Sequence, residues 1–407
     1  MSAPWERAII LMDMNAFFAS VEQLDRAELQ GRAIGITNGA IGTCIITCSY
    51  EARAFGVKTG MRLREAWQLC PDLIQIPSRP ERYAEVSSQI MEALTTITPD
   101  VEIFSVDEAF LDVTHCQRLL GTPEQIGLAV KRTVYLASGL LCSVGVAGDK
   151  TTAKWAAKLN KPDGLTVIPP WQSAERLRNV PVTELCGIAA GIGGYLAERG
   201  VHVCGDMAKL PISELGRKFG NVGRRIWLMA QGLDPSPVET RIAPPKSIGH
   251  GKVMPPNTRS SETIHTYLEH MSFKVSARLR RHALVAQRYF IGLRAGTGWL
   301  GGSYHTPAPT ADGAALIQLG RRMLAEHWRG EGVNQVQVTA LDPGPAAGQL
   351  ELFETKIEQA NKSNAVMDAI NQRYGEFTLT PARLLKRSNT PNVIAPAWKP
   401  HGHRQTI

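Results

Sequence analysis

Two neighbouring acids interrupt an apolar segment in the first third of the chain. In FSVDEAFLDVT (104–114), Asp107 and Glu108 lie within the stretch 101–113, whose β-branched and aromatic residues predict a strand covered on both faces. Burying a carboxylate without a partner is costly, and an adjacent like charge raises the cost. A divalent cation such as Mg²⁺ would remove this cost, because hard ions prefer carboxylate oxygens. A strand end whose acids face water explains this stretch equally well.

A third acid is expected at the end of another strand. The apolar run 8–12 predicts a buried strand that stops at Asp13, just before a helix that Asn15 could cap. Ligand sites are commonly built at strand ends, because side chains leave the core there while the backbone stays fixed. Taken alone, an Asp in this place is ordinarily a turn or cap residue.

Two further segments place basic side chains where they could contact phosphate. In TCSYEARAFGVKTGM (47–61), Tyr50 and Arg53 share a helix face, and the planar guanidinium suits bidentate contact with phosphate. Lys161 stands before Pro162 at a helix stop, which would leave its ammonium on a loop. Taken singly, each feature is also compatible with an ordinary surface residue.

Composition limits the function classes. At 407 residues the chain suits two to four domains. Lys and Arg exceed Asp and Glu by 45 to 37, and this formal net charge of +8 is compatible with a polyanionic partner. No run approaches the ~18 apolar residues of a membrane span, and the N-terminus lacks a signal-peptide pattern, so a cytoplasmic protein is expected. The seven dispersed cysteines predict reduced thiols.

Five motifs occur in the order and approximate spacing of one known family. They are Asp13 after a strand, SYEARAFGVKTGM, SVDEAFLDVT, SVGVAGDKTTAKWAAKLNKPDG and LCGIAAGIGGYLAERG. Over about residues 7–345 this set resembles the Y-family translesion DNA polymerases, most closely their bacterial DNA polymerase IV branch, and five spaced motifs are a specific signal. The resemblance implies an α/β multidomain fold with the architecture of a right-hand polymerase.

The resemblance also implies the domain organisation. The expected fold has a palm, small fingers, a helical thumb with a helix-hairpin-helix, and an α+β little finger. The Pro- and Gly-containing basic segment RIAPPKSIGHGK predicts an extended linker. The predicted ranges are palm, 1–16 and 82–172; fingers, 17–81; thumb, 173–240; linker, 241–251; little finger, 252–345; and tail, 346–407.

If the resemblance holds, the three acids form the catalytic site. Asp13, Asp107 and Glu108 would be the catalytic carboxylates of the palm and, with the carbonyl of Met14, the ligands of two Mg²⁺ ions. In nucleotidyl transfer one ion lowers the pKa of the primer 3′-hydroxyl, and the other neutralises the triphosphate and the leaving pyrophosphate. This role would explain why a nearly apolar strand carries an acidic pair.

The incoming nucleotide has its own implied contacts. Phe18 stands at the steric-gate position of the family, where a ring under the sugar excludes a 2′-hydroxyl, and Phe17 would help to form the pocket floor. Simple core packing is the alternative for both rings. The residues that match family contacts with the triphosphate are Thr47, Tyr50, Arg53 and Lys161.

Two regions are expected to contact the DNA backbone without reading its sequence. The segment 182–202 resembles a helix-hairpin-helix, with Gly187 and Gly191 at the hairpin and Ala189 where a second hairpin glycine is common. A second departure from the family is Asp149, where an Asn is frequent. The little-finger sheet is expected to place three arginines along the duplex, although a solvated helix face is the alternative for this basic stretch. These are Arg278, Arg288 and Arg294.

The tail contains two further motifs. QLELF, after a Pro/Ala/Gly stretch, resembles the peptide by which bacterial polymerases dock onto the sliding clamp, although a small helix folding back on the little finger is the alternative. The segment 363–379 has the spacing of an amphipathic helix followed by a short strand. It resembles the tail of the polymerase V catalytic subunit and of related mutagenesis-cassette proteins, which suggests that it binds a partner. The implied clamp contacts are Gln349, Leu350, Leu352 and Phe353.

Two functions compete at this point. The resemblance implies an Mg²⁺-dependent, low-fidelity DNA-directed DNA polymerase that performs translesion synthesis on primer-template DNA with dNTPs and lacks proofreading. The alternative is a noncatalytic Y-family adaptor that bridges the sliding clamp and other mutagenesis proteins. The three intact acids favour the polymerase. A basic DNA-binding protein without enzymatic activity would leave the buried acids unexplained.

Overall fold

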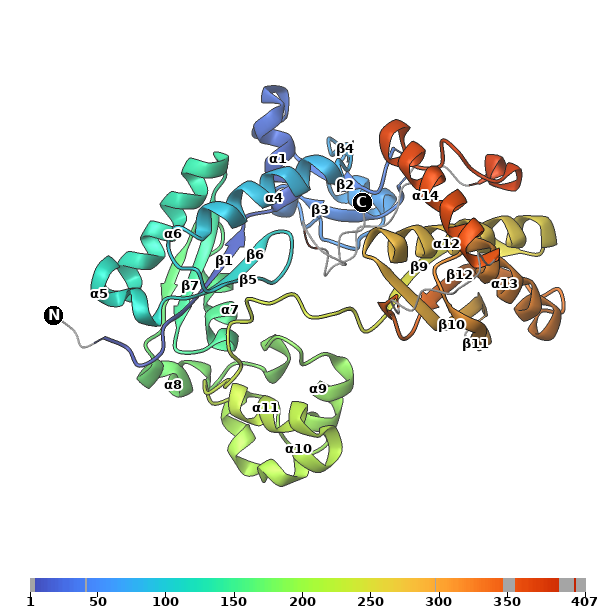
Figure 1. Ribbon diagram of the computed structural model, residues 1–407. Helices are drawn as coiled ribbons and strands as arrows, with labels where there is room; N and C mark the ends of the chain where they lie inside the picture. The colour runs from blue at the N-terminus through green and yellow to red at the C-terminus, as the bar shows by residue number, and fades with distance from the viewer. Residues whose placement is uncertain (1–3, 41, 297, 347–355, 388–398, 400–407) are drawn as a thin grey trace. The chain divides into compact units, whose positions relative to one another are not determined.

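The chain folds into two compact units. The computed structural model describes residues 4–40, 42–296, 298–346, 356–387 and 399 (Figure 1). The first unit comprises Met1–Ile242 together with Val393–Ile407, and the second comprises Ala243–Asn392. Within the described ranges, no helix is both long and apolar enough to cross a membrane.

A five-stranded sheet forms the centre of the first unit. Its order is β5-β6-β1-β7-β8, and β1 runs antiparallel to both of its neighbours. The strands are β1 (Ile9–Met14), β5 (Val101–Ile103), β6 (Glu108–Asp112), β7 (Cys142–Ala147) and β8 (Leu165–Val167). The helices of this region are α4 (Pro80–Leu94), α5 (Gln117–Leu120), α6 (Pro123–Ser138) and α7 (Lys150–Leu159).

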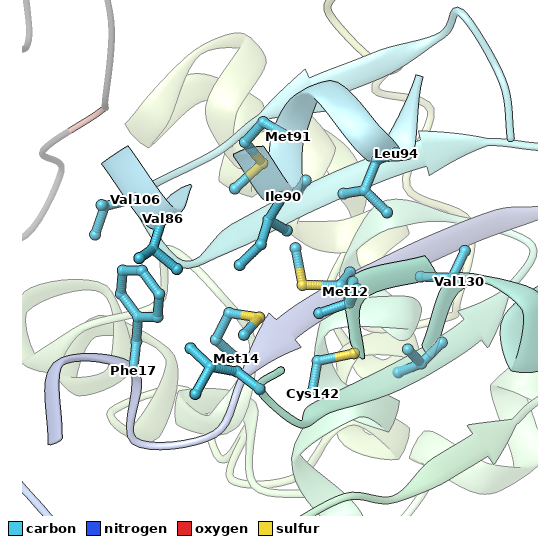
Figure 2. Close-up of a cluster of buried hydrophobic side chains, with 14 of the residues drawn as sticks. Met12, Met14, Phe17, Val86, Ile90, Met91, Leu94, Val106, Val130 and Cys142 are labelled. Atoms are coloured by element: carbon cyan, nitrogen blue, oxygen red, sulfur yellow. The ribbon is translucent and has the colours of Figure 1, made fainter. Parts of the chain in front are cut away.

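Strand β1 contributes alternate residues to two cores, one on each face of the sheet. Met12 packs with Ile90 of α4, on the face that α4 and α6 cover (Figure 2). Leu11 points to the other face, where it packs with Ala153 of α7. Because side chains alternate along a strand, Asp13 lies on the same face as Leu11, the face covered by α7. The apolar alternation of β1 therefore directs this carboxylate toward α7.

A buried acid begins α7. Asp149 is the N-cap residue, and its carboxylate accepts hydrogen bonds from the Thr152 backbone N–H at 2.9 Å and from the Thr152 hydroxyl at 2.6 Å. Burial raises the pKa of Asp149. A carboxylate that accepts hydrogen bonds from the first turn of a helix is a typical N-cap. This departure from the family therefore supplies the cap of the helix beside the sheet.

The acidic pair lies at a hairpin, and the prediction of one continuous strand over 101–113 is wrong. Strands β5 and β6 are separate and pair antiparallel. In the turn between them, the Ser105 hydroxyl donates to Asp107 Oδ1 at 2.6 Å, and the Ser105 N–H donates to the Glu108 carbonyl at 3.1 Å. The apolar pattern led to the wrong prediction because two strands joined by a short turn have almost the same periodicity as a single strand.

Smaller elements complete the first unit, and they follow the chain order expected of fingers and thumb. A three-stranded sheet has the order β3-β2-β4, and four other helices enclose a separate apolar core. The first group is α1 (Phe17–Asp25), β2 (Ile34–Thr37), β3 (Ile45–Cys48), α2 (Tyr50–Ala54), α3 (Leu63–Leu69) and β4 (Ile74–Pro77). The second group is α8 (Ser173–Leu177), α9 (Ala190–Ala197), α10 (Ile212–Phe219) and α11 (Asn221–Met229).

The second unit combines an antiparallel sheet with helices, as expected for a little finger. The sheet order is β11-β10-β12-β9, with β13 beside β10, and α12 and α13 share its apolar core. Strand β9 begins at Ile248, inside the range 241–251 that was predicted to be a linker. The elements are β9 (Ile248–Thr258), α12 (Ser261–Arg281), β10 (Leu284–Ala295), β11 (Gly298–Thr310), α13 (Gly313–His327), β12 (Val333–Ala340) and β13 (Gly344–Pro345).

The described part of the tail lies against α12. Helix α14 (Lys356–Tyr374) agrees with the predicted amphipathic helix, but turns follow it in place of the expected strand. Arg280 of α12 forms a bidentate pair with Asp368 at 2.6 and 2.7 Å, and Lys274 pairs with Glu376 at 2.6 Å. The tail therefore contacts α12 through ion pairs and through the Phe377 ring, whose centroid lies 4.9 Å from that of His270. A short 3-10 helix (Ala382–Lys386) lies near the end of the described segment.

Candidate active site

A cavity of about 360 Å³ opens where β1 ends. It brings together residues from β1, α1, β3 and α2 with the turn before β6 and the loop after α7. The predicted residues that line it are Asp13, Met14, Phe17, Phe18, Thr47, Arg53, Asp107 and Lys161. Four lining residues had no functional signal in the sequence: Ala16, Ile46, Thr59 and Val106. The predicted metal and nucleotide positions thus converge on one cavity, with Tyr50 and Glu108 outside its lining.

Strand register sets Asp13 and Glu108 side by side. The two residues are directly opposed in the antiparallel ladder between β1 and β6, so their side chains point to the same face. Asp107 lies in the preceding turn, where its carbonyl accepts from the Met14 N–H at 2.9 Å. Burial raises the pKa of Asp13 to about 7 and also raises the pKa of Asp107. Burial thus favours the protonated form of both acids, and the nearby Lys161 ammonium opposes this effect.

Two lysines supply positive charge to the acids. The Lys161 ammonium donates a hydrogen bond to Asp13 Oδ1, and Lys154 Nζ lies 2.5 Å from Glu108 Oε1. Sequence reasoning found Lys161 through the family motif but missed Lys154. A lysine within a helix is normally exposed, and only the packing of α7 against the sheet shows that this one faces the acids.

The donor set fits a hard divalent cation. Three carboxylates and the Met14 carbonyl are the oxygen ligands that Mg²⁺ prefers, and Asp13 and Asp107 line the same cavity. Among the residues that the structure describes, no three acidic, histidine or cysteine side chains already converge to hold a metal. Glu108 is instead paired with Lys154. For all three acids to bind metal, Glu108 would have to leave that lysine or bind the cation beside its ammonium.

Helix α2 presents two of the predicted phosphate contacts together. The Arg53 guanidinium lies 4.8 Å from the centroid of the Tyr50 ring, as expected for residues three apart on a helix. The Ser49 side chain caps the helix by accepting from the Ala52 N–H at 3.4 Å. Burial raises the pKa of Tyr50, so its hydroxyl keeps the proton that it could donate to a phosphate.

The turn from β1 into α1 has a strained conformation beside the cavity. Ala16 is the N-cap of α1, with φ 45° and ψ 47°, a left-handed conformation that is unfavourable for a residue with a Cβ. The expectation that Asn15 caps the helix is wrong, because its side-chain oxygen instead accepts from the Ser143 hydroxyl at 2.9 Å. The turn brings Phe17 and Phe18 to the cavity immediately after the acidic strand end.

Phe18 is held by a buried network that the sequence did not predict. Its ring stacks on Tyr83 of α4, with centroids 4.3 Å apart and an interplanar angle of 12°. The Tyr83 hydroxyl donates to the fully buried Glu22 at 2.7 Å, and Arg79 donates to the same carboxylate at 2.9 Å. Helical spacing relates Phe18 to Glu22 and Arg79 to Tyr83, but no local pattern links the two pairs, which lie on α1 and at the start of α4.

Comparisons with known proteins agree with this geometry. The model of the impB/mucB/samB family matches residues 12–158, and the model of that family's C-terminal domain matches residues 245–352. A DNA polymerase IV from Moorella thermoacetica is 35% identical over 376 residues, which cover 91% of this chain and 94% of that protein. A DNA polymerase IV from Shewanella woodyi is 37% identical over 281 residues, covering 68% and 76%.

The chain belongs to the Y-family of DNA polymerases. A solved Y-family DNA polymerase chimera of Dbh and Dpo4 aligns with a TM-score of 0.71 at 27% identity, covering 83% of this chain and 100% of that one. The expected fold class, an α/β right-hand polymerase, is thereby confirmed, and the chain is a DNA-directed DNA polymerase by family. The catalytic and binding roles of individual residues stay predictions, as does the likeness of the tail to polymerase V subunits.

The predicted DNA-backbone residues lie on several different elements of the two units. Gly187 adopts φ 92° just before α9, and Gly191 lies in the first turn of that helix. In the second unit, Arg288 and Arg294 are exposed on β10. Arg278 lies on α12 instead, where it is partly buried and burial lowers its pKa. The expectation that the sheet carries all three arginines is therefore wrong for Arg278.

We expect Tyr83→Leu to weaken the sugar selectivity that the Y-family assignment implies for Phe18. Loss of the stacked ring would let the Phe18 side chain move, so discrimination against ribonucleotides should fall about three- to tenfold. Single-nucleotide insertion with dNTP and rNTP would measure it. Tyr83→Phe keeps the ring and loses only the bond to Glu22, so its selectivity should stay near that of the wild type. Equal selectivity in all three proteins would exclude a positioning role for Tyr83.

Proposed function

We propose that this protein performs low-fidelity translesion DNA synthesis by two-metal nucleotidyl transfer, in the cytoplasm, on primer-template DNA with dNTPs. The observation that carries the proposal is the placement of Asp13, Asp107 and Glu108 at one end of the palm sheet, beside the cavity that Phe18 and Arg53 line. Acidic oxygens beside cationic groups suit a reaction that joins a hydroxyl to a triphosphate.

The predicted metal and nucleotide contacts at and beside the cavity would each have a role in this reaction. Bound Mg²⁺ would supply charge neutralisation and a lower pKa for the primer 3′-hydroxyl. Arg53 and Lys161 would hold and orient the triphosphate, and Tyr50 and Thr47 would add hydroxyl donors beside it. The residues that would hold the two ions are Asp13, Asp107, Glu108 and the carbonyl of Met14.

The same cavity would also set the choice of sugar. The Phe18 side chain is only 8% exposed, and its stacking on Tyr83 leaves the ring little freedom to yield to a 2′-hydroxyl. Phe17, which is 3% exposed, would support the pocket floor. Because the buried rings cannot move aside cheaply, the site should favour deoxynucleotides.

Tolerance of damaged templates is proposed to follow from the size of the fingers. Helices α2 and α3 contain five and seven residues, so only a small surface is available to enclose a nascent base pair. Weak enclosure lowers the penalty for a misshapen pair. We also propose that the protein does not proofread, so that it should extend or leave a mismatched primer end without removing the terminal nucleotide.

Extension of a labelled primer on undamaged template, with Mg²⁺ and dNTPs, tests the proposed function. We expect template-dependent products that chelation by EDTA abolishes. The same assay with a mismatched primer should show no shortening. If folded protein that binds DNA makes no product even with the sliding clamp present, the adaptor function replaces the polymerase.

The sliding clamp is a proposed partner through a segment that lies outside the described residues. This segment contains Gln349, Leu350, Leu352 and Phe353. Exposed apolar side chains in such a peptide suit a pocket on another protein. Joint replacement of Leu352 and Phe353 by Ala should abolish stimulation by the clamp and leave distributive synthesis intact. Survival of clamp binding in a pull-down would place the docking peptide elsewhere.

A partner from a mutagenesis cassette is proposed for the exposed side of α14. Asp368 and Glu376 are already paired with α12, whereas Val366 and Tyr374 are 60% and 64% exposed. An apolar side chain exposed to this extent is available to another protein. The part of the tail that pairs with α12 and the part that would meet a partner are thus different.

A further inference from the structure

Helix α7 carries two lysines in closely similar surroundings. Lys150 and Lys154 are four residues apart and share a helix face. Lys150 Nζ lies 2.5 Å from Glu102 Oε2, and Lys154 Nζ lies 2.5 Å from Glu108 Oε1. Each ammonium also lies over a phenylalanine ring, at 4.8 and 4.4 Å from the ring centroid, respectively. The two ion pairs are therefore matched in distance, helix and aromatic contact.

The two pairs differ in what the acid can do. Glu102 also accepts a hydrogen bond from the Glu239 N–H at 2.7 Å, which ties β5 to the segment after the thumb helices. Glu108 instead lies directly opposite Asp13 at the candidate metal site. Of these two lysines, only Lys154 therefore contacts a group that a divalent cation would need.

The contact between Lys154 and Glu108 is short and largely shielded from water. The side chains of Lys154 and Glu108 are only 12% and 17% exposed, so water screens their attraction weakly. A cation that binds Glu108 must either break this contact or bind beside a second positive charge, and both possibilities lower the cation's affinity.

We propose that Lys154 is a positioning residue, which holds the Glu108 carboxylate in the DNA-free protein and competes with a divalent cation for it. This inference rests on the proposed function. Lys161 contacts Asp13 in a similar way, so the acids are neutralised by the chain itself before metal binds. Full metal occupancy is then favoured once the nucleotide's phosphate oxygens add ligands, which delays assembly of the site until substrate is present.

Mn²⁺ binding to the DNA-free, nucleotide-free protein tests the inference without measuring activity. The titration, followed by the electron paramagnetic resonance signal of free Mn²⁺ at one fixed pH, would compare wild type with Lys154→Met. We expect the variant to bind Mn²⁺ about three- to tenfold more tightly, because a competing charge is gone. Its melting temperature without metal should fall, since Glu108 loses its counter-ion.

Lys150→Met is the matched control, because it removes the equivalent ammonium from Glu102. It should lower the melting temperature without metal and leave Mn²⁺ affinity within about twofold of the wild type. Lys154→Arg keeps the positive charge and should also bind Mn²⁺ like the wild type. Lys154→Gln serves if the Met variant does not fold. If folded Lys154→Met or Lys154→Gln binds Mn²⁺ no more tightly than the wild type, the inference is overturned.

Asp107→Ala separates failure of this inference from failure of the proposed function. If Asp107→Ala weakens Mn²⁺ binding while Lys154→Met leaves it unchanged, the metal site stands and the competition by Lys154 is rejected. If Asp107→Ala has no effect on Mn²⁺ binding, the acids are not metal ligands, and both the two-metal proposal and the inference about Lys154 fail. Tighter binding by Lys154→Met alone, with weaker binding by Asp107→Ala, supports both.

Discussion

Asp107→Ala is expected to abolish primer extension, with a loss of about 10³-fold or more in rate, because a metal ligand supplies several kcal/mol of transition-state stabilisation. Asp107 lines the cavity and is held there by the Ser105 hydroxyl at 2.6 Å. Single-turnover insertion of one nucleotide by excess enzyme would measure the loss directly.

Asp112→Asn is a suitable control for that experiment. Asp112 lies at the far end of β6, where its side chain accepts from the Thr114 N–H at 3.0 Å, and Asn keeps this acceptor. Its insertion rate should stay within about threefold of the wild type. Folding and DNA binding of both variants would be checked by circular dichroism and fluorescence anisotropy. Retention of synthesis by folded Asp107→Ala would exclude the assigned metal ligand.

Phe18→Ala is expected to admit ribonucleotides. The ring lines the cavity and is braced by Tyr83, so its removal opens space next to the strand end where the sugar is proposed to lie. We expect discrimination between dNTP and rNTP to fall by about 100-fold, mainly through faster rNTP insertion. The ratio of kcat/KM values for a matched dNTP and rNTP provides the measurement.

Phe17→Leu tests whether that effect is specific to the gate. Phe17 is the neighbouring ring and lines the same cavity, but it packs into the core beneath α4 (Figure 2). This substitution should lower stability and overall insertion, while the preference for dNTP over rNTP stays within about threefold of the wild type. Unchanged sugar discrimination in Phe18→Ala would show that another residue acts as the gate.

Local pattern and motif were sufficient for the residues that lie next to one another or in recognisable segments. The apolar run before Asp13 and the spacing of Tyr50 and Arg53 indicated a strand end and a shared helix face, and both features are present. The family motifs also led to Lys161, which lies beside Asp13. These features depend on backbone periodicity and short-range order, which a sequence carries directly.

Other features were predicted incorrectly or missed because they depend on contacts between distant elements. The run 101–113 divides into two strands, since polar bonds made by Ser105 close a turn that hydrophobic periodicity does not reveal. Arg278 lies on a helix apart from the sheet arginines. In the tail, charged residues rather than the apolar Val366 contact α12, because opposite charges on the two segments meet.

The sequence by itself determined the family, most of the acidic and basic residues of the candidate site and the alternation that puts Asp13 on the same strand face as Leu11. Tertiary structure alone decided which side chains hold the site residues in place: Lys154 pairs with Glu108, and Tyr83 stacks on Phe18. The reason is physical. Which side chains share a face follows from local backbone geometry, whereas which faces meet follows from how helices far apart in the chain pack on the sheet.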